Sequence, residues 1–176
     1  IDDLLALSQI EGGELPEREP VPVRHVLAEA VDRTRPAADL GGVKLVFHEP
    51  DLSLTVLGDR RQLVSAVANL CDNAVKYSDE GAEVSVAAHL DGDTVRLEVA
   101  DQGIGIPARD LERVFERFYR VDRARSRETG GTGLGLAIVR HVAHNHAGDV
   151  TVSSREGVGS TFALPLPAYF PDEDQP

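Results

Sequence analysis

Two asparagines and a lysine stand at intervals that place them together on one side of an expected helix. Asn69, Asn73 and Lys76 follow one another by four and three residues, and at about 100° per residue they form one strip beside the apolar face. Asparagine is a poor helix former, because its side chain competes for backbone hydrogen bonds. Amide oxygens beside one cation suit Mg²⁺ bridging to phosphates, although structural asparagines bonded to nearby loops fit the same pattern.

A second motif that could do chemistry is the segment 101–107, Asp-Gln-Gly-Ile-Gly-Ile-Pro, which directly follows an expected strand. Its two glycines allow the backbone to approach a flat ligand closely. The carboxylate of Asp101 can accept a hydrogen bond from an exocyclic amino group. Because the same pattern describes many plain turns, by itself it leaves a ligand site and a turn equally open.

The segment 130–136, Gly-Gly-Thr-Gly-Leu-Gly-Leu, leads into another expected helix. Free N–H groups at a helix N-terminus, combined with flexible glycines, form a favourable anion site. No Gly-Lys-Ser/Thr follows, which excludes a Walker A loop, and no strand directly precedes the segment, which argues against a Rossmann fingerprint. A hinge without a ligand is the alternative interpretation.

Charge is distributed unevenly along the chain. The formal net charge is −12, which argues against nucleic-acid binding, since that calls for a basic face. An anionic ligand therefore needs cations gathered around it. The dense basic stretch of the sequence consists of Arg113, Arg117, Arg120, Arg123, Arg125 and Arg127. Acidic residues are interleaved with these arginines, so a solvated loop also fits.

The remaining bulk properties fit a soluble globular domain with 41% hydrophobic and 27% charged residues. The single cysteine, Cys71, excludes an internal disulfide, suits a reducing compartment and is interpreted as a small apolar filler. No apolar run reaches the roughly 20 residues of a membrane helix. The histidines show no zinc-binding spacing, and we expect His144 and His146 to face solvent or compensate a helix dipole.

An α+β domain must position these residues. The pattern predicts helices at residues 24–38, 59–76 and 134–146, the second with Asp59 and Gln62 in a capping-box-like arrangement. Strands are expected at residues 44–48, 53–57, 84–90, 95–99, 150–153 and 161–166. This order of elements predicts one sheet with helices packed on one face.

Taken together, the motifs resemble those of the catalytic and ATP-binding domain of sensor histidine kinases, in the group shared with gyrase, heat-shock chaperone and mismatch-repair ATPases. The resemblance covers about residues 20–167, with the N box at 69–78, the G1 box at 101–106, the F box at 115–120, the G2 box at 131–136 and a final glycine motif at 157–162. It implies a Bergerat-type ATP-binding fold, a two-layer α+β sandwich. In this fold about three helices cover one face of a mixed, mostly antiparallel sheet of about five strands.

The resemblance also implies residue roles, with ATP and Mg²⁺ as ligands. Asn73 would coordinate the metal, and Arg120 with the segment 121–133 would form a mobile lid that Phe115 and Phe118 anchor to the core. The implied catalytic residues are Asn69, Lys76 and Arg120. The implied nucleotide-binding residues are Asn69, Asn73, Lys76, Tyr77, Asp101, Gly103, Gly105, Ile106, Arg120, Gly131, Thr132, Gly133, Leu134, Gly135 and Thr161. Of these, Tyr77, Asp101, Gly105, Ile106 and Thr161 would surround the adenine.

One position departs from the relatives that hydrolyse ATP with water. Those proteins carry a glutamate one helical turn before the metal-binding asparagine, where this chain has Asn69. An amide cannot act as a general base, which favours phosphotransfer to a protein side chain over hydrolysis. A conformational ATPase and a non-catalytic nucleotide-binding module are the alternative functions.

The expected organisation places the end of a second dimerisation helix at 1–14, a linker at 15–22, the catalytic domain at 23–167 and an acidic disordered tail at 168–176. His48-Glu49-Pro50 is rejected as the phosphate acceptor because its proline follows too closely, so the acceptor histidine is expected upstream. The expected partners are the parent's own dimerisation and phosphoacceptor domain and a cognate response regulator. The isolated chain is expected to be a cytoplasmic monomer without direct membrane contact, from a homodimeric parent anchored in the bacterial inner membrane.

Overall fold

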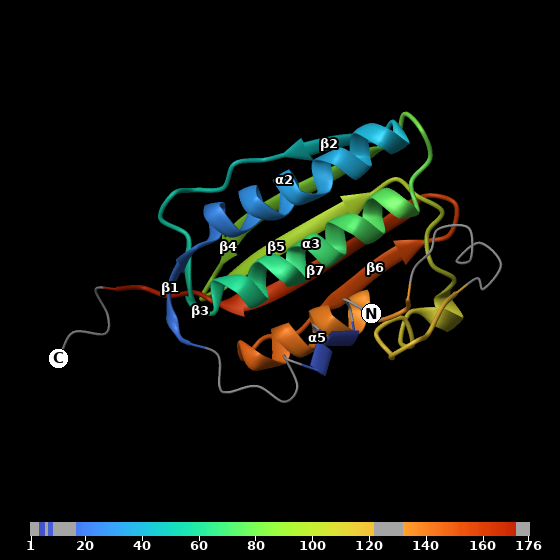
Figure 1. Cartoon of the computed structure of the whole chain (residues 1–176). Helices are drawn as coiled ribbons and strands as arrows, with labels where there is room; N and C mark the ends of the chain where they lie inside the picture. Colours follow the sequence, from blue (N-terminus) through green and yellow to red (C-terminus); the bar gives the residue numbers. More distant parts are fainter. Residues whose placement is uncertain (1–3, 6, 9–16, 122–131, 172–176) are drawn as a thin grey trace.

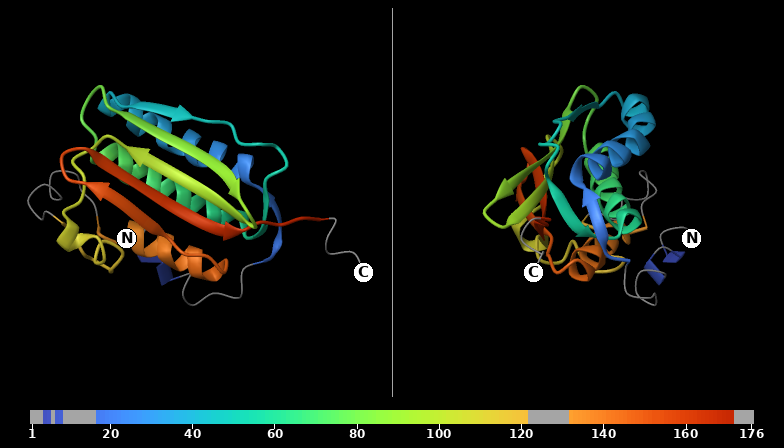
Figure 2. Two further views of the ribbon diagram at one scale, coloured as in Figure 1. Left: turned by 180° about the vertical axis from the view of Figure 1, so that it is seen from behind. Right: turned by 90° about the vertical axis from the view of Figure 1, so that its left-hand side faces the viewer.

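The computed structural model describes residues 4–5, 7–8, 17–121 and 132–171. In this part of the chain, three long helices cover one face of a five-stranded sheet (Figures 1 and 2). The helices are α2 (Val23–Gly41), α3 (Arg60–Lys76) and α5 (Gly135–Asn145). The strands are β1 (Glu19–Pro22), β2 (Lys44–Phe47), β3 (Thr55–Gly58), β4 (Glu83–Asp91), β5 (Thr94–Asp101), β6 (Thr151–Arg155) and β7 (Gly159–Pro167). The predicted two-layer α+β sandwich is confirmed.

The large sheet has the strand order β2-β4-β5-β7-β6. Strand β2 runs parallel to β4, whereas the pairs β4–β5, β5–β7 and β6–β7 are antiparallel. Because side chains alternate along a strand, one face of the sheet is apolar and packs under the helices. Its buried residues include Val84, Val86, Val95, Leu97, Val99, Phe162, Leu164 and Leu166. The predicted core stripe of α3 is also buried, at Leu63, Val67, Leu70 and Ala74.

A small second sheet was not predicted. Strand β1 pairs with β3 in antiparallel register, from Glu19 opposite Gly58 to Pro22 opposite Thr55. The segment 15–22 was expected to be a linker because of its prolines, yet its last four residues form this strand. Proline lacks a backbone N–H but is tolerated on an edge strand, and Val21 between the prolines is 1% exposed. The ordered domain therefore begins before residue 23.

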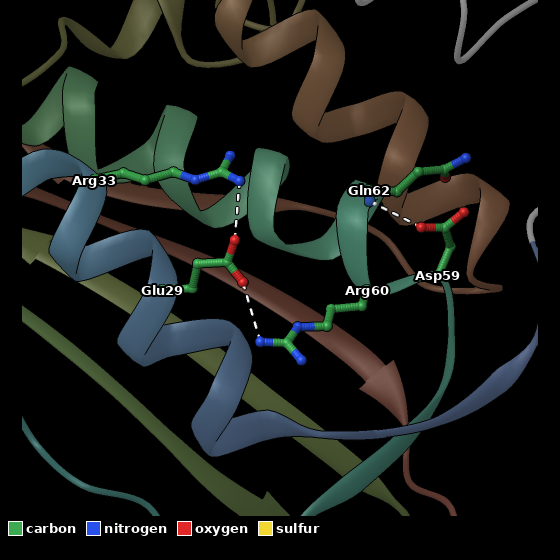
Figure 3. A network of polar contacts seen from close by, with 5 residues as sticks. All are labelled: Glu29, Arg33, Asp59, Arg60 and Gln62. Carbon is green, nitrogen blue, oxygen red and sulfur yellow. Dashed lines mark hydrogen bonds and ion pairs between the residues drawn. The ribbon is translucent and has the colours of Figure 1, made fainter.

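A charged network joins α2 to the start of α3 (Figure 3). The Glu29 carboxylate accepts hydrogen bonds from Arg33 at 2.9 Å and from Arg60 at 3.2 Å. Beside it, Asp59 caps α3 by accepting from the backbone N–H of Gln62 at 3.2 Å. The predicted cap of α3 by the Asp59 side chain is thus confirmed, but only this half of the capping box is formed. The Gln62 side chain completes no reciprocal bond there; its Oε1 accepts instead from the Asn145 amide at 3.2 Å.

His146 does not face solvent, contrary to expectation. Its ring is buried between the end of α5 and the start of α3. Nε2 accepts from the Asp59 backbone N–H at 3.0 Å, and Nδ1 lies 2.7 Å from the Val142 carbonyl oxygen. This pair of partners requires a neutral ring with its proton on Nδ1, and burial lowers the pKa of His146. His144, by contrast, is exposed as expected and lies 3.5 Å from Asp149.

The two ends of the described chain also differ from expectation. Ala168 and Tyr169 were assigned to a disordered tail, but their N–H groups donate to Asp93 and Thr55 carbonyls at 2.8 Å. The remaining tail, 172–176, lies outside the described residues. Near the N-terminus Leu7 is 2% exposed and packs in the core. Among the described residues, no helix combines the length and apolarity needed to cross a membrane.

Candidate active site

A cavity of about 200 Å³ lies where α3 and the start of α5 meet the end of the central strands. It collects most of the residues that the motifs singled out. The predicted residues in its wall are Asn69, Asn73, Lys76, Tyr77, Asp101, Gly105, Ile106, Arg120, Thr132, Gly133 and Gly135. Residues in the wall that the sequence did not single out as ligands are Asp72, Ile104, Val114, Tyr119, Val121, Leu136, Ser160 and Phe162. Segments far apart in sequence therefore form one site.

Helix α3 supplies the amide wall of the cavity. The Asn69 Nδ2 donates to the Ser65 carbonyl at 2.9 Å, so the Oδ1 of Asn69 is left on the side of Gly135. A Cβ atom at Gly135 would lie 3.1 Å from this oxygen. Gly135 therefore leaves room for the Asn69 amide, and Asn73 lies one helical turn further along the wall. Asn69 and Asn73 therefore line the cavity from the same helix.

Asp101, the last residue of β5, also lies in the cavity wall. Its Oδ1 accepts from the backbone N–H of Gly103 at 2.8 Å and of Ser160 at 3.3 Å. Its Oδ2 takes part in neither of these two bonds, and the residue lies in the cavity wall. Burial raises the pKa of Asp101, and the two N–H bonds oppose this effect. The arrangement presents one fixed acceptor to the cavity.

The glycines of the 101–107 segment serve close packing. Gly103 is not in the cavity wall, but a Cβ atom there would overlap the Tyr77 carbonyl oxygen. Gly105 has φ +71° and passes so close to the Arg155 carbonyl that a side chain would collide with it. Both glycines are therefore needed to hold the backbone beside Asp101.

On β7 the structure places Ser160 and Phe162 in the wall, and Thr161 is not among the wall residues. Successive strand residues point to opposite sides, so two neighbours of Thr161 line the cavity while it does not. The Ser160 hydroxyl lies 2.7 Å from that of Ser154, which accepts from the Ile106 N–H at 2.7 Å. The period-two pattern of β7 carried this signal, because buried Phe162 places Ser160 on the same face.

The F box, residues 115–120, borders the cavity through Tyr119 and Arg120, and we call this segment the rim. Phe115 packs edge-on against Phe162 with ring centroids 6.1 Å apart, which agrees with an anchoring role. Phe118 does not anchor through its side chain, which is 64% exposed. Its backbone N–H instead donates to the Gly133 carbonyl at 2.9 Å.

The glycine-rich segment is described from residue 132 onwards. Gly131 and the expected lid residues 122–131 lie outside the described residues. Leu134 precedes the first residue of α5, is 2% exposed, and donates its N–H to the Thr132 hydroxyl at 3.4 Å. Leu134 packs in the core and is not in the cavity wall, whereas Thr132 and Gly133 are.

The donor set of the cavity suits Mg²⁺. Within the described part of the chain, no three His, Cys, Asp or Glu residues cluster as a metal site. The oxygen donors of the α3 wall are the amides of Asn69 and Asn73 and the carboxylate of Asp72. A few oxygen ligands from the protein fit Mg²⁺, since waters and substrate phosphates usually fill the rest of its coordination shell.

Comparison with known proteins decides the family. Residues 58–169 match the family described as histidine kinase-, DNA gyrase B- and HSP90-like ATPases. The chain belongs to this family. The match begins next to the α3 cap and ends at Tyr169, so it spans both sides of the cavity.

Sensor kinases are prominent among the similar members of this ATPase family. The chain is 49% identical over 175 residues to the sensor-like histidine kinase SenX3 of Mycolicibacterium smegmatis, covering 99% of this chain and 45% of that protein. It is 32% identical to the mycobacterial sensor histidine kinase MprB, covering 86% of this chain and 97% of that structure, with a TM-score of 0.72. Full-length ShkA, solved in complex with AMPPNP, is 30% identical. The match covers 95% of this chain and 35% of that structure, with a TM-score of 0.78.

Proposed function

We propose that the chain binds Mg-ATP in this cavity and transfers the γ-phosphate to a histidine on the dimerisation and phosphoacceptor domain of its parent protein. Asp101 carries the proposal: one of its carboxylate oxygens is held by two backbone N–H groups, and the other is left for the adenine amino group. A cognate response regulator would receive the phosphoryl group next. The parent would be a homodimer anchored in the bacterial inner membrane, with this domain in the cytoplasm.

The amide wall would bind the phosphates. Asn73, with Asn69 beside it, would hold Mg²⁺ through side-chain oxygens. The bound ion would neutralise charge on the β- and γ-phosphates. Lys76, Arg120 and Thr132, which all lie in the cavity wall, would contact the phosphate oxygens.

Transfer, and not hydrolysis, follows from the chemistry of α3. The Asn69 amide is engaged with the Ser65 carbonyl and has no basic atom with which to activate water. The acceptor imidazole nitrogen would attack the γ-phosphorus, forming a P–N bond as the P–O bond to ADP breaks. The domain contributes positioning and charge stabilisation, which dominate phosphoryl transfer.

Incubation with γ-labelled ATP tests this function. The chain alone should bind Mg-ATP but remain unlabelled, and added upstream helical hairpin from its own parent should acquire acid-labile, base-stable label. Asn73→Ala should suppress that label. Asp91→Asn, an exposed substitution at the turn between β4 and β5, should not. ATP turnover with no transfer to the hairpin would support the conformational-ATPase alternative and refute this proposal.

A further inference from the structure

A buried carboxylate lies behind the cavity rim without touching the cavity. Asp110 ends the short helical turn Ala108–Asp110, and its side chain is 9% exposed. Its Oδ1 accepts a hydrogen bond from the Tyr119 hydroxyl. Its Oδ2 has no hydrogen-bond partner among the described residues; the Arg109 Nε lies 3.7 Å away on a side chain that is 80% exposed. A buried carboxylate with so few partners is unfavourable unless it has a purpose.

Its partner Tyr119, the F-box residue before Arg120, stands in the cavity wall. The guanidinium of Arg113 lies 4.4 Å from the centre of the Tyr119 ring, and Arg113 is itself paired with Glu116 at 3.2 Å. The ring is therefore held at its hydroxyl and on its face. The hydrogen bond to Asp110 raises the pKa of Tyr119, which keeps the hydroxyl a donor.

The backbone next to Tyr119 needs such support. Phe118 adopts φ +62°, a left-handed conformation that is unusual for a bulky residue. Its exposed ring gains no burial there, while its N–H is bonded to the Gly133 carbonyl. A Cβ atom at Gly133 would come within 2.8 Å of the Phe118 Cα. A strained residue in tight contact persists only where its neighbours fix it, and the Tyr119–Asp110 bond is one of the restraints next to Phe118.

We propose that Asp110 is a positioning residue for the nucleotide site, which through Tyr119 holds the rim so that Arg120 reaches the phosphates. Asp110 is absent from the cavity wall, whereas Tyr119 and Arg120 are in it. The inference rests on the proposed ATP binding. It does not involve Asp101, the proposed adenine contact, because that side chain is fixed by the backbone of Gly103 and Ser160. Loss of the restraint should therefore weaken ligands that carry phosphates and spare the nucleoside.

Equilibrium binding of Mg-ATP and of adenosine to the full chain tests this inference. Tyr119→Phe and Asp110→Ala should each lower ATP affinity about tenfold, and the double variant should lose no more than either single one. Adenosine affinity should stay within about twofold in all three, which also shows that they fold. Asp110→Asn keeps an acceptor for Tyr119 and should restore ATP affinity to within about threefold of the original. Glu112→Ala, at an exposed side chain between Asp110 and Tyr119, is the matched control and should leave ATP affinity unchanged.

Two results would overturn the inference while the proposed function stands. One is additive loss in the double variant, which would mean that Asp110 and Tyr119 act independently. The other is an equal loss of ATP and adenosine affinity, which would assign Asp110 to general folding. Failure of the original chain to bind Mg-ATP would instead refute the proposed function, and this inference with it.

Discussion

Replacing Asp101 by asparagine tests the proposed adenine contact with a change of one atom. The Oδ1 of Asp101 accepts from the N–H groups of Gly103 and Ser160, so asparagine must keep its oxygen at that position. Its NH₂ group then takes the place of Oδ2 and, in the proposed complex, would face the adenine amino group, donor against donor. The alternative rotamer moves the same conflict to the two backbone N–H groups. No orientation of the asparagine satisfies both sides.

The expected loss follows from this geometry. An unsatisfied buried donor and a lost bond to a charged acceptor cost about 1–3 kcal/mol or more, which is roughly a five- to hundredfold rise in the Kd of ATP. The fold should survive, because burial raises the pKa of Asp101 and a neutral amide removes that desolvation cost. Guanine carries a carbonyl oxygen where adenine has its amino group. The ratio of GTP to ATP affinity should therefore rise about tenfold.

Titration calorimetry with ATP and GTP, together with urea unfolding, measures these effects. Asp91→Asn is a matched control, since Asp91 is an exposed aspartate at the other end of the β4–β5 hairpin. Unchanged ATP affinity would remove Asp101 from the site. Equal losses for ATP and GTP would show that the carboxylate does not read the base, and a large fall in unfolding free energy would make its role structural.

Three further predictions concern other parts of the domain. Asn73→Ala should weaken ATP binding more in Mg²⁺ than in EDTA, and equal losses would deny a role through the metal. Gly135→Ala places a methyl group 3.1 Å from the Asn69 Oδ1 and should weaken ATP binding several-fold without lowering the urea midpoint; unchanged affinity would show that this oxygen is not needed. Because burial lowers the pKa of His146, its contribution to stability is complete above the unfolded pKa of about 6.5 and is lost as pH falls toward the folded pKa. Urea unfolding between about pH 7.5 and pH 5.5 should show a steeper loss for the original chain than for His146→Leu, in which the Asp59 N–H bond is gone, and parallel slopes would contradict this.

The sequence predicted the elements whose patterns are local. The apolar period of α3, its Asp59 cap and the β4–β5 hairpin each depend on neighbouring residues, and each appears in the structure with small shifts of its ends. The N-box asparagines were identified because their type conflicts with helix propensity. Membership of the ATPase family followed from the joint occurrence of the boxes.

What the sequence did not predict depends on contacts between distant segments. Strand β1 exists because β3 pairs with it, which overrides the proline content of the segment. His146 is buried because a backbone N–H 87 residues away needs an acceptor. Asp110 has no motif of its own, since its significance comes from the Tyr119 hydroxyl nine residues further on.

The pairing of β5 with β7 has a consequence for the synthesis of the protein. Asp101 and the Ser160 N–H that holds it are 59 residues apart, and the intervening chain contains the F box, the glycine-rich segment and α5. A chain leaving the ribosome completes the β4–β5 hairpin early, but β5 then presents an open edge until β7 has been made. During that interval the Ser160 N–H bond to Asp101 and the β7 side of the cavity are missing. Nucleotide can therefore stabilise only the finished sheet, and ATP in the cell would favour complete chains over truncated ones.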